Sequence, residues 1–593
     1  MRRKALRLQC AWWVSILAVS ACRQESPITA ASGPPQGRFA AVDASLITAA
    51  YTCGNYFRIR NANWAIAPLT YTVQETGEQG ALAVASRPQA YPYNETYLLT
   101  ATTGTLQLSS AGVVVATQAN GRTSCATSST AGSWTNPTPW PLVAIHSALL
   151  PTGKVMTWGR MELTVPEYPR IWDPVADPQA TQSQAQAQYP VTNNPFCAGD
   201  ALMPDGRLLV AGGHYNTNSG RPTAETFDPI ALAWSQVPNM RAGRWYPTVT
   251  ALANGEMLVE SGPDSAMIPD SIPEVLQVDG TWRQLTNARR YPEIYPWNFQ
   301  APNGQVFSAG QTVNTQYINT SGTGSLGPVI PHVVNTLRDY GSAVMYDAGK
   351  ILVVGGGIPT ERTAEVIDLN KPSPQWAYTG FMSFPRRQLV ATIQADGQVL
   401  VTGGGCCDSR GGINPVLIPE VWNPNNGHWT HMAPMQIVRI YHSTALLLPD
   451  GRILSAGSGQ PADAGQVDQF NAEIYSPPYL FNPDGTLATA SRPLLLYAPP
   501  TVGYGQQFKI WTQNVIPSRM LWIRLGVGTH SFNQNQRLNK LPFVQIPIPP
   551  GNASTPFAVT APASPNLAPP GHYLFFVLNA AGTPSLGRII QIH

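Results

Sequence analysis

The chain has 593 residues, of which 43% are hydrophobic and 12% are charged, and its formal net charge is +3. It is too long for one ordinary domain, and its apolar content is sufficient for several cores, so we expect two or three domains. No cluster of lysine and arginine follows the first eight residues. Nothing in the sequence therefore indicates a nucleic-acid partner.

Residues 1–21 have the pattern of an export signal. A basic start, MRRKALR, precedes an apolar stretch of about a dozen residues, which is too short to span a bilayer. The sequence VSAC that ends at Cys22 resembles a bacterial lipobox, in which the cysteine is acylated and becomes the new N-terminus. We therefore expect an exported protein of a bacterial cell envelope (periplasm, outer membrane or cell surface), anchored to a membrane by lipid on Cys22. The alternative is ordinary cleavage, which leaves Cys22 as a thiol.

The other cysteines have separate expected roles. Cys53 and Cys125 bracket a short strand-rich segment and are expected to form a disulfide. Cys406 and Cys407 are adjacent, and the sequence leaves open whether they form a vicinal disulfide or are two buried thiols. Cys197 has no obvious partner thiol in an oxidising compartment, so it needs another explanation.

Residues 22–41 have the composition of a linker, and residues 42–130 are predicted to form an N-terminal β-sandwich. Segments such as YFRIRNANWAIAPLTYTVQ and GVVVATQ alternate between apolar and polar residues with the period of two that indicates strands. Helix-period segments are scarce along the whole chain. We therefore predict an all-β protein.

From about residue 150, a tight-turn signal recurs before an apolar strand that ends in glycine, as in PDGRLLVAGG and PDGRILSAG. The turn glycines of the seven copies are Gly153, Gly206, Gly255, Gly304, Gly349, Gly397 and Gly451, at separations of 45 to 54 residues. A period of about fifty residues with double glycines and a later tryptophan is typical of kelch repeats, each of which forms one four-stranded propeller blade. We predict a seven-bladed kelch-type β-propeller over residues 131–485.

Segments on both sides of the repeats complete the predicted architecture. The segment around Trp134 resembles the outer strand of later repeats, and it is expected to complete the seventh blade, because ring closure usually needs a strand from the other end of the propeller. Residues 486–593 contain further alternating segments, such as HYLFFVL. They are predicted to form a C-terminal immunoglobulin-like β-sandwich.

The repeat also predicts a ring of side chains around the propeller channel, because residues at one offset before the turn glycine are equivalent in every blade. Nine residues before that glycine the chain has Ala144, Cys197, Tyr246, Tyr295, Tyr340, Gln388 and His442. A single tyrosine or histidine at a blade mouth is usually a packing residue, but so many reactive residue types in one ring indicate a chemical site. The other histidines outside this ring, apart from His530, are interpreted as surface or structural residues: His146, His214, His332, His428, His431, His572 and His593.

Tyr441 directly precedes His442 in the run VRIYHSTALLLPDGRILSAG. Adjacent residues of a regular strand face opposite sides, so both side chains can bind one metal only at a strand entrance or bend, which a blade mouth provides. A roughly perpendicular pair of imidazole and phenolate ligands favours copper(II). Zinc is less suitable, because its structural sites prefer thiolates and its catalytic sites keep three strong ligands.

Four segments resemble the copper radical oxidases, the family of galactose oxidase and glyoxal oxidase. NNPFCAGDALMPDGRLLVAGG is similar to the segment with the family's crosslinked cysteine, at Cys197, and MRAGRWYPTVTALANGEMLV to the segment with its crosslinked tyrosine, at Tyr246. VRIYHSTALLLPDGRILSAG matches the axial tyrosine and first histidine, and GVGTHSFNQNQRL matches the second histidine, at His530. The resemblance covers about residues 131–593, and details such as RWYPTV and AEIYSPPYLF are closer to the glyoxal oxidase branch.

The resemblance implies a thioether radical cofactor formed by Cys197 and Tyr246 beside a copper ion, which explains a cysteine without a partner thiol. Tyr246, His442 and His530 would be equatorial ligands, and Tyr441 would be the axial ligand and the base. The expected reaction is oxidation of small aldehydes or primary alcohols by O2, which gives hydrogen peroxide.

The remaining ring residues have two open interpretations. Tyr295, Tyr340 and Gln388 either form the substrate wall or only pack and hydrogen-bond across the channel. Trp245 is a candidate to line the pocket and shield the radical, because it directly precedes Tyr246. We expect a monomer. The competing hypothesis is a non-catalytic, surface-tethered propeller that binds glycan or protein, and the complete set of ligands favours the enzyme.

Overall fold

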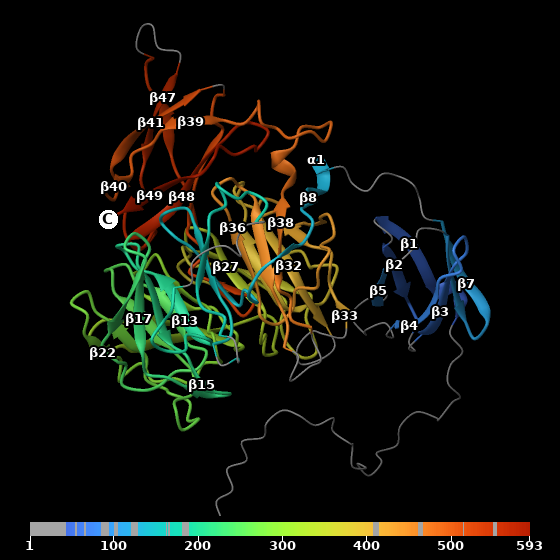
Figure 1. Ribbon diagram of the computed structural model, residues 1–593, viewed down its shortest axis with the longest axis horizontal. Helices are drawn as coiled ribbons and strands as arrows, with labels where there is room; N and C mark the ends of the chain where they lie inside the picture. Colours follow the sequence, from blue (N-terminus) through green and yellow to red (C-terminus); the bar gives the residue numbers. More distant parts are fainter. Residues whose placement is uncertain are drawn as a thin grey trace, which may run out of the picture. The chain divides into compact units, whose positions relative to one another are not determined.

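The structure is a computed structural model of the chain (Figure 1). It describes residues 43–53, 56–63, 67–84, 94–99, 105–119, 128–161, 163, 166–180, 189–406, 414–460, 467–513, 515–548 and 554–593. The chain divides into two compact units, unit 1 with residues 1–51 and 55–121 and unit 2 with residues 52–54 and 122–593.

Several sequence predictions fall outside the described residues. They are the export signal, the lipid on Cys22, the linker and the disulfide partner Cys125. Cys406 is disulfide-bonded, and Cys407 is not among the described residues.

The regular secondary structure of the described residues is almost entirely strand, which confirms the all-β prediction. The short helices are η1 (Ala44–Leu46), α1 (Ser128–Ala131) and η3 (Pro478–Leu480). No helix in the described ranges has the length and apolar character needed to cross a membrane.

Unit 1, blue in Figure 1, contains two sheets. Their strand orders are β1–β2–β5 (Ile47–Cys53, Tyr56–Asn61, Asn94–Leu99) and β4–β3–β6–β7 (Gln79–Val84, Ala67–Val73, Leu106–Ser110, Val113–Gln118). Apolar residues of both sheets, such as Phe57 from β2 and Leu69 from β3, form one buried core. This arrangement of two sheets around one core agrees with the alternating sequence pattern.

Unit 2 contains seven sheets in repeat order, each built on one predicted repeat. The first repeat contributes β10 (His146–Leu149), β11 (Val155–Trp158) and β12 (Arg170–Trp172). The next three sheets are β13, β14, β17 and β18 (Ala198–Leu202, Leu208–Gly212, Ala224–Asp228, Ala233–Val237), β19 to β22 (Thr248–Ala251, Met257–Glu260, Glu274–Leu276, Trp282–Gln284) and β23 to β26 (Asn298–Gln300, Val306–Ser308, Asn314–Asn319, Ser325–Pro331).

The last three sheets follow the same antiparallel order. They are β27 to β30 (Ser342–Asp347, Lys350–Val354, Ala364–Asp368, Ala377–Tyr378), β31, β32, β34 and β35 (Arg387–Ile393, Val399–Cys406, Glu420–Trp422, Trp429–His431) and β36, β37, β38 and β8 (Ser443–Leu447, Ile453–Gly457, Asn471–Ser476, Ser133–Trp134). Shorter strands pair beside them: β9 (Thr138–Pro139) with β38, β33 (Asn414–Pro415) with β32, and β15 (His214–Asn216) with β16 (Ser219–Gly220).

The turn that recurs in every repeat requires a backbone conformation that glycine adopts readily. All seven turn glycines have φ between 70° and 93°, in the left-handed region that side chains with a Cβ disfavour. Each glycine lies between the first and second strands of its sheet, as where Leu202 of β13 pairs with Leu208 of β14 around Gly206. The recurring turn glycine therefore predicts the hairpin formed by the first two strands of each sheet.

The first strands of the sheets contact one another in sequence. β13 contacts β19, β19 contacts β23, β27 contacts β31, β31 contacts β36, and β36 contacts β10 of the first sheet. β23 and β27 share a core in which Phe299 packs with Ala343 and Met345. These first strands are almost wholly buried and lie at the centre of the apolar packing.

Two segments from outside the repeats add strands to the first and last sheets. Trp134 of β8 pairs with Tyr475 of β38, which confirms that this segment supplies the outer strand of the last sheet. The first sheet differs from the expected four-stranded blade, because the free edge of β10 pairs with β43 (Val527–Thr529), which continues into β44 (Phe532–Gln534). The C-terminal region thus enters the repeat region as a hairpin.

The rest of the C-terminal region, orange to red in Figure 1, forms two sheets around one core. Their orders are β39–β41–β47–β46 (Leu494–Tyr497, Gln507–Gln513, Thr555–Thr560, Phe543–Gln545) and β40–β49–β48–β42–β45 (Thr501–Val502, Arg588–Ile592, Gly571–Leu578, Arg519–Arg524, Leu538–Lys540). Phe557 from the first sheet and Trp522 from the second are both buried in the core.

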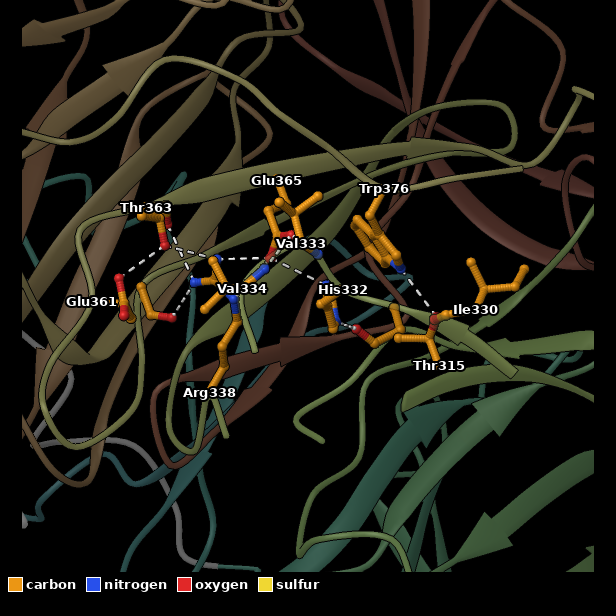
Figure 2. Close-up of polar contacts among 12 residues, drawn as sticks. Thr315, Ile330, His332, Val333, Val334, Arg338, Glu361, Thr363, Glu365 and Trp376 are labelled. Atoms are coloured by element: carbon orange, nitrogen blue, oxygen red, sulfur yellow. Dashed lines mark hydrogen bonds and ion pairs between the residues drawn. The ribbon is translucent and has the colours of Figure 1, made fainter. Parts of the chain in front are cut away.

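A buried arginine–glutamate pair recurs in four sheets and fixes the loop that leads into the first strand. The pairs are Arg244–Glu274, Arg338–Glu365, Arg386–Glu420 and Arg439–Glu473. Figure 2 shows the second pair, in which Arg338 reaches Glu365 and Thr363 at 2.8 Å. Arg338 also donates to the carbonyl of Gly355, at 2.9 Å. The arginine therefore ties its loop to the second and third strands.

We expect Arg338→Ala to destabilise unit 2 strongly. Although burial alone raises the pKa of Glu365, the hydrogen bond from His332 and the charge of Arg338 outweigh it, so the carboxylate is held ionised. Without Arg338 that charge loses its arginine partner, and breaking a buried pair typically costs about 3–5 kcal/mol. Urea unfolding followed by tryptophan fluorescence measures the loss. Arg207→Ala, which removes an exposed pair with Asp205, should cost below about 1 kcal/mol, and equal losses would contradict this account.

Candidate functional site

The predicted ring exists as a set of equivalent backbone positions. Six of its seven residues have a positive φ, from 50° to 66°: Cys197, Tyr246, Tyr295, Tyr340, Gln388 and His442. The amide of Tyr246 donates to the carbonyl of Cys197 at 2.9 Å, and the amide of Tyr295 donates to the carbonyl of Tyr246 at 2.8 Å. Such conformations typically cost about 1–3 kcal/mol and collect at functional sites. The repeat alignment therefore identified one strained position in each of these sheets.

His530 reaches the ring on the tip of the β43–β44 hairpin. His530 and Ser531 have φ of 49° and 68°, as the two central residues of a type I′ turn require. Ser531 holds the tip in place, because its amide donates to the carbonyl of Ser443 at 2.9 Å and its hydroxyl donates to that of Ile440 at 3.1 Å. The imidazole of His530 lies 4.8 Å from that of His442, between ring centres, at an interplanar angle of 84°.

The side chains that follow the hairpin tip form hydrogen bonds with backbone groups in the first strands of several sheets. Asn533 bonds to Ala445 in β36, and Asn535 bonds to Val249 and Ala251 in β19. Gln536 bonds to Ala391 and Ile393 in β31, and Arg537 bonds to Gln300 in β23. Unpaired backbone groups on a buried edge would be costly, so these bonds replace the missing neighbouring strand. They also fix the height of His530.

Two phenol oxygens meet at the same place. The hydroxyl oxygens of Tyr246 and Tyr441 are 2.5 Å apart. Tyr441 and His442 directly precede β36, which begins at Ser443, and their rings stack with centroids 3.9 Å apart. The ring of Tyr246 is 4.4 Å from that of His530. The strand entrance thus brings together the four predicted ligand side chains.

Hydrogen bonds orient the two imidazoles. Nδ1 of His442 donates to the carbonyl of Gly459 at 2.9 Å, which leaves the lone pair on Nε2. Nδ1 of His530 lies 2.6 Å from the hydroxyl of Thr529 and 3.3 Å from that of Tyr295. Its Nε2 lies 3.8 Å from the sulfur of Cys197. Both imidazoles therefore have their Nδ1 atoms engaged by neighbours.

Burial shifts the pKa values of the tyrosine and histidine side chains at the site toward their neutral forms. It raises the pKa of Tyr246 well above the ordinary value, and Cys197 and Tyr441 raise it further. Burial likewise raises the pKa of Tyr441, with contributions from Tyr340 and Cys197. Burial lowers the pKa of His530 well below its ordinary value, and His442 adds to this effect. At neutral pH these phenols are protonated and His530 is neutral, so a metal cation that binds the phenol oxygens would have to displace their protons.

Tyr246 is enclosed by other side chains. Trp245 stacks on it with ring centroids 3.7 Å apart and an interplanar angle of 6°, and Tyr295 stacks at 4.6 Å and 24°. Cys197 is 1% exposed, packs in the same cluster and forms no disulfide. The indole of Trp245 is anchored, because its Nε1 donates to Nδ1 of His214 at 3.2 Å.

The three candidate wall residues differ in their surroundings. Tyr295 donates to the carbonyl of Ala198 at 3.0 Å and contacts His530, which fits the packing interpretation. Gln388 is 1% exposed, and neither polar atom of its amide has a hydrogen-bond partner. Tyr340 is half-buried, and its ring meets that of Tyr441 edge-on at 5.8 Å. Tyr340 is therefore the wall candidate next to the expected base.

A second set of equivalent residues lies one position before the ring: Phe196, Trp245, Ile294, Asp339, Arg387 and Tyr441. Sequence reasoning named Trp245 and Tyr441 but missed the other four and the offset that all six share. Phe196 packs 5.6 Å from His442 and 5.9 Å from His530, between ring centres. Arg387 pairs with Asp339 and lies 5.1 Å from the ring of Tyr340. Shifting the repeat alignment by one residue finds all six.

Two histidines interpreted as surface or structural are buried beside the site. His146 stacks on Trp158 with centroids 4.6 Å apart, and it contacts Asp200 at 3.3 Å. His214 anchors Trp245. These contacts fit the structural interpretation for both, and neither histidine lies on the surface.

The described residues contain no group of three or more His, Cys, Asp and Glu side chains able to hold a metal. The candidate centre therefore depends on its two tyrosine oxygens in addition to His442 and His530. Imidazole and phenolate donors together are typical of copper or iron centres rather than of zinc sites.

Comparisons with known proteins agree with this geometry. Residues 178–479 match the family model described as glyoxal oxidase N-terminus, and residues 492–592 match that described as galactose oxidase-like, early set domain. Galactose oxidase of Gibberella zeae is 30% identical over 506 residues, which cover 78% of this chain and 70% of that protein. Aldehyde oxidase GLOX of Vitis pseudoreticulata is 28% identical over 447 residues, which cover 68% of this chain and 82% of that protein.

A solved structure has a similar fold. It is a fungal alcohol oxidase of the AA5 family in complex with copper, with a TM-score of 0.69 and 26% identity over 78% of this chain and 99% of that chain. The fold and the matches together define an oxidase. The chain belongs to the galactose oxidase and glyoxal oxidase family, which confirms the resemblance carried by the four motifs.

We expect His214 to make unit 2 less stable in acid. Burial lowers its pKa to about 4, and Arg221 adds to this, whereas an unfolded histidine takes up a proton near about pH 6.5. The unfolded state therefore binds more protons between these values, and the free energy of unfolding falls as the pH drops through them. His214→Gln, which keeps an acceptor for Trp245, should flatten this decline in thermal unfolding between pH 7.5 and 4.5. The exposed control His428→Gln should keep the wild-type slope, and identical slopes for all three proteins would contradict the prediction.

Proposed function

We propose that the chain is a copper radical oxidase that oxidises small aldehydes or primary alcohols with O2 and releases hydrogen peroxide. One observation carries this proposal: Tyr246, Tyr441, His442 and His530 converge at one point, and the phenol oxygens of the two tyrosines are 2.5 Å apart. Membership of the oxidase family supports it.

The residues present fit a copper ion. Because Nδ1 of His442 donates to the carbonyl of Gly459, its Nε2 would be the coordinating nitrogen, and His530 and the two phenol oxygens would provide further nitrogen and oxygen donors. The copper complex of the similar fungal alcohol oxidase supports this choice of metal. Bound there, copper would act as a Lewis acid for the substrate oxygen and accept one electron.

We further propose that Cys197 and Tyr246 form a thioether. The new bond from sulfur to the phenol ring would replace one S–H and one ring C–H bond, and O2 would take up the two hydrogens with their electrons as peroxide. Their shared buried cluster and adjacent backbone positions support this bond. The stacked Trp245 would shield a radical on Tyr246 from solvent.

Each chain residue then has a defined task in the reaction. Tyr441 would take the hydroxyl proton of an alcohol or an aldehyde hydrate, and Tyr246, as a radical, would take a hydrogen atom from the same carbon. The substrate loses two electrons and two protons in total, and O2 gains them to become hydrogen peroxide. Alcohols would give aldehydes, and aldehyde hydrates would give acids.

The architecture we propose for this enzyme is a seven-bladed kelch-type propeller with a C-terminal immunoglobulin-like sandwich. The seven sheets in repeat order and the contacts of β36 with β10 support the propeller. The match of residues 492–592 to the early set domain and the shared core of the two C-terminal sheets support the sandwich. Unit 1 is proposed to be a separate N-terminal sandwich.

The direct test of the oxidase uses Cys197→Ser. Copper-treated wild type should show a tryptic crosslink between the peptides of Cys197 and Tyr246, with the mass of two hydrogens missing, and should release peroxide from glyoxal-type aldehydes or simple alcohols. Cys197→Ser should lack the crosslink and lose peroxide release by at least about a hundredfold, because the radical lacks its thioether. Copper-loaded, active wild type without the crosslink would refute the radical mechanism, and no activity on any aldehyde or primary alcohol would refute the oxidase.

The location is a separate proposal. We propose that the protein is exported and anchored by lipid on Cys22, supported by the VSAC sequence that ends at this residue. Expression in a bacterial host should give a mature chain that begins at Cys22 and incorporates labelled palmitate. Cys22→Ser should abolish the label without changing activity, and an unlabelled wild type would overturn the lipid anchor.

A further inference from the structure

We infer that unit 2 carries a second binding site, for a neutral saccharide, in a cleft away from the candidate metal centre. The cleft has a volume of about 660 Å³, within the range of about 300–1,000 Å³ typical of ligand sites. The sheet of β31, β32, β34 and β35, helices α1 and η3, and the loop between β48 and β49 form its walls.

The cleft and the metal centre lie at opposite ends of one strand. Gln388 of the ring lies at the start of β31, and Gln394 of the cleft directly follows its end. At about 3.3 Å per residue, this part of the chain spans roughly 20 Å. A ligand in the cleft therefore leaves the centre open to a small substrate.

Polar side chains in the cleft point to a hydroxyl-rich ligand. Gln394 is 1% exposed, and its amide nitrogen has no hydrogen-bond partner. A buried donor without a partner is unfavourable, and a hydrogen bond to a ligand oxygen would remove that penalty. Beside it, the side-chain amide of Gln398 is held by the carboxyl of Asp396 at 2.6 Å. The hydroxyls of Thr430 and Thr583 add groups that both donate and accept.

Aromatic side chains in the cleft provide surfaces on which a sugar ring can pack. Tyr479 is fixed at its hydroxyl, which donates to the carbonyl of Gly451 at 2.5 Å and accepts from the amide of Ala395 at 3.4 Å. Phe481 lines the same cleft and is half-buried. The electron-rich face of an aromatic ring packs well against the C–H face of a sugar ring, whose hydroxyls then reach the polar groups at its edge.

The charge of the cleft favours a neutral ligand. Among the described residues that line it, none is a lysine or an arginine, and Asp396 is the one carboxyl. Both oxygens of that carboxyl already accept hydrogen bonds from Gln398. An acidic polymer would find no cation, and a basic ligand would find no available carboxylate.

The test measures retention of the full-length protein on polysaccharides by affinity electrophoresis, with isothermal titration calorimetry on the strongest binder. The probes are galactomannan, xyloglucan and laminarin as neutral polymers, polygalacturonate as an acidic one, and gelatin peptides. The variants are Phe481→Ala and Gln398→Ala, and the control is Tyr497→Ala, which removes an aromatic ring that is 50% exposed outside the cleft.

We expect wild type to bind at least one neutral polymer. Phe481→Ala and Gln398→Ala should weaken that binding at least tenfold, and Tyr497→Ala should leave it unchanged. Peroxide release from a soluble small substrate should be the same in all four proteins, which separates this inference from the proposed oxidase function. Absence of neutral-polymer binding, binding unaffected by the two cleft variants, or binding confined to polygalacturonate or peptides would overturn the inference.

Discussion

The site depends on the pairing of the β43–β44 hairpin with the free edge of β10. This pairing brings a residue of the C-terminal region among the first strands of the repeats, and side chains that follow it bond to the backbone of β19, β23, β31 and β36. Because those strands would otherwise leave buried polar groups unmet, folding of the repeats and placement of His530 are coupled. Of the four candidate metal ligands, the repeat region alone contains only Tyr246, Tyr441 and His442.

Assembly of such a site is unfavourable before any metal binds. Six ring residues and both residues of the hairpin tip have positive φ, and a buried phenol and a buried neutral histidine lie beside the half-buried Tyr441. Packing around the site offsets this cost. The buried arginine–glutamate pairs fix the loops that lead to Tyr246, Tyr340, Gln388 and His442, and the hydrogen bonds of Ser531 fix the hairpin tip. Rigid neighbours of this kind keep strained ligand side chains in place.

The seven repeats could be predicted from the sequence, because each repeat contains a tight turn with positive φ that needs glycine, and this glycine recurs about every fifty residues. The offset from those glycines also identified Cys197, Tyr246 and His442, since equivalent positions have equivalent backbones. His530 lies outside the repeats, so only the family resemblance indicated it. Arg387 and Asp339 were missed because one offset was considered, although the next offset contains them. The hairpin insertion could not be predicted, since the run FNQNQR reads locally as a polar loop and its partners lie far away in the sequence.

Copper binding by the His530→Ala variant tests the central claim most directly. Calorimetry should show one tight equivalent of copper(II) for wild type, and electron paramagnetic resonance of the radical-free form should show two imidazole nitrogens. His530→Ala should bind copper at least tenfold more weakly and lose one of these nitrogens, while its metal-free form unfolds at nearly the wild-type temperature. The exposed His428→Ala variant should match wild type. If His530→Ala binds copper as tightly as wild type with an unchanged spectrum, the four residues do not form the metal centre.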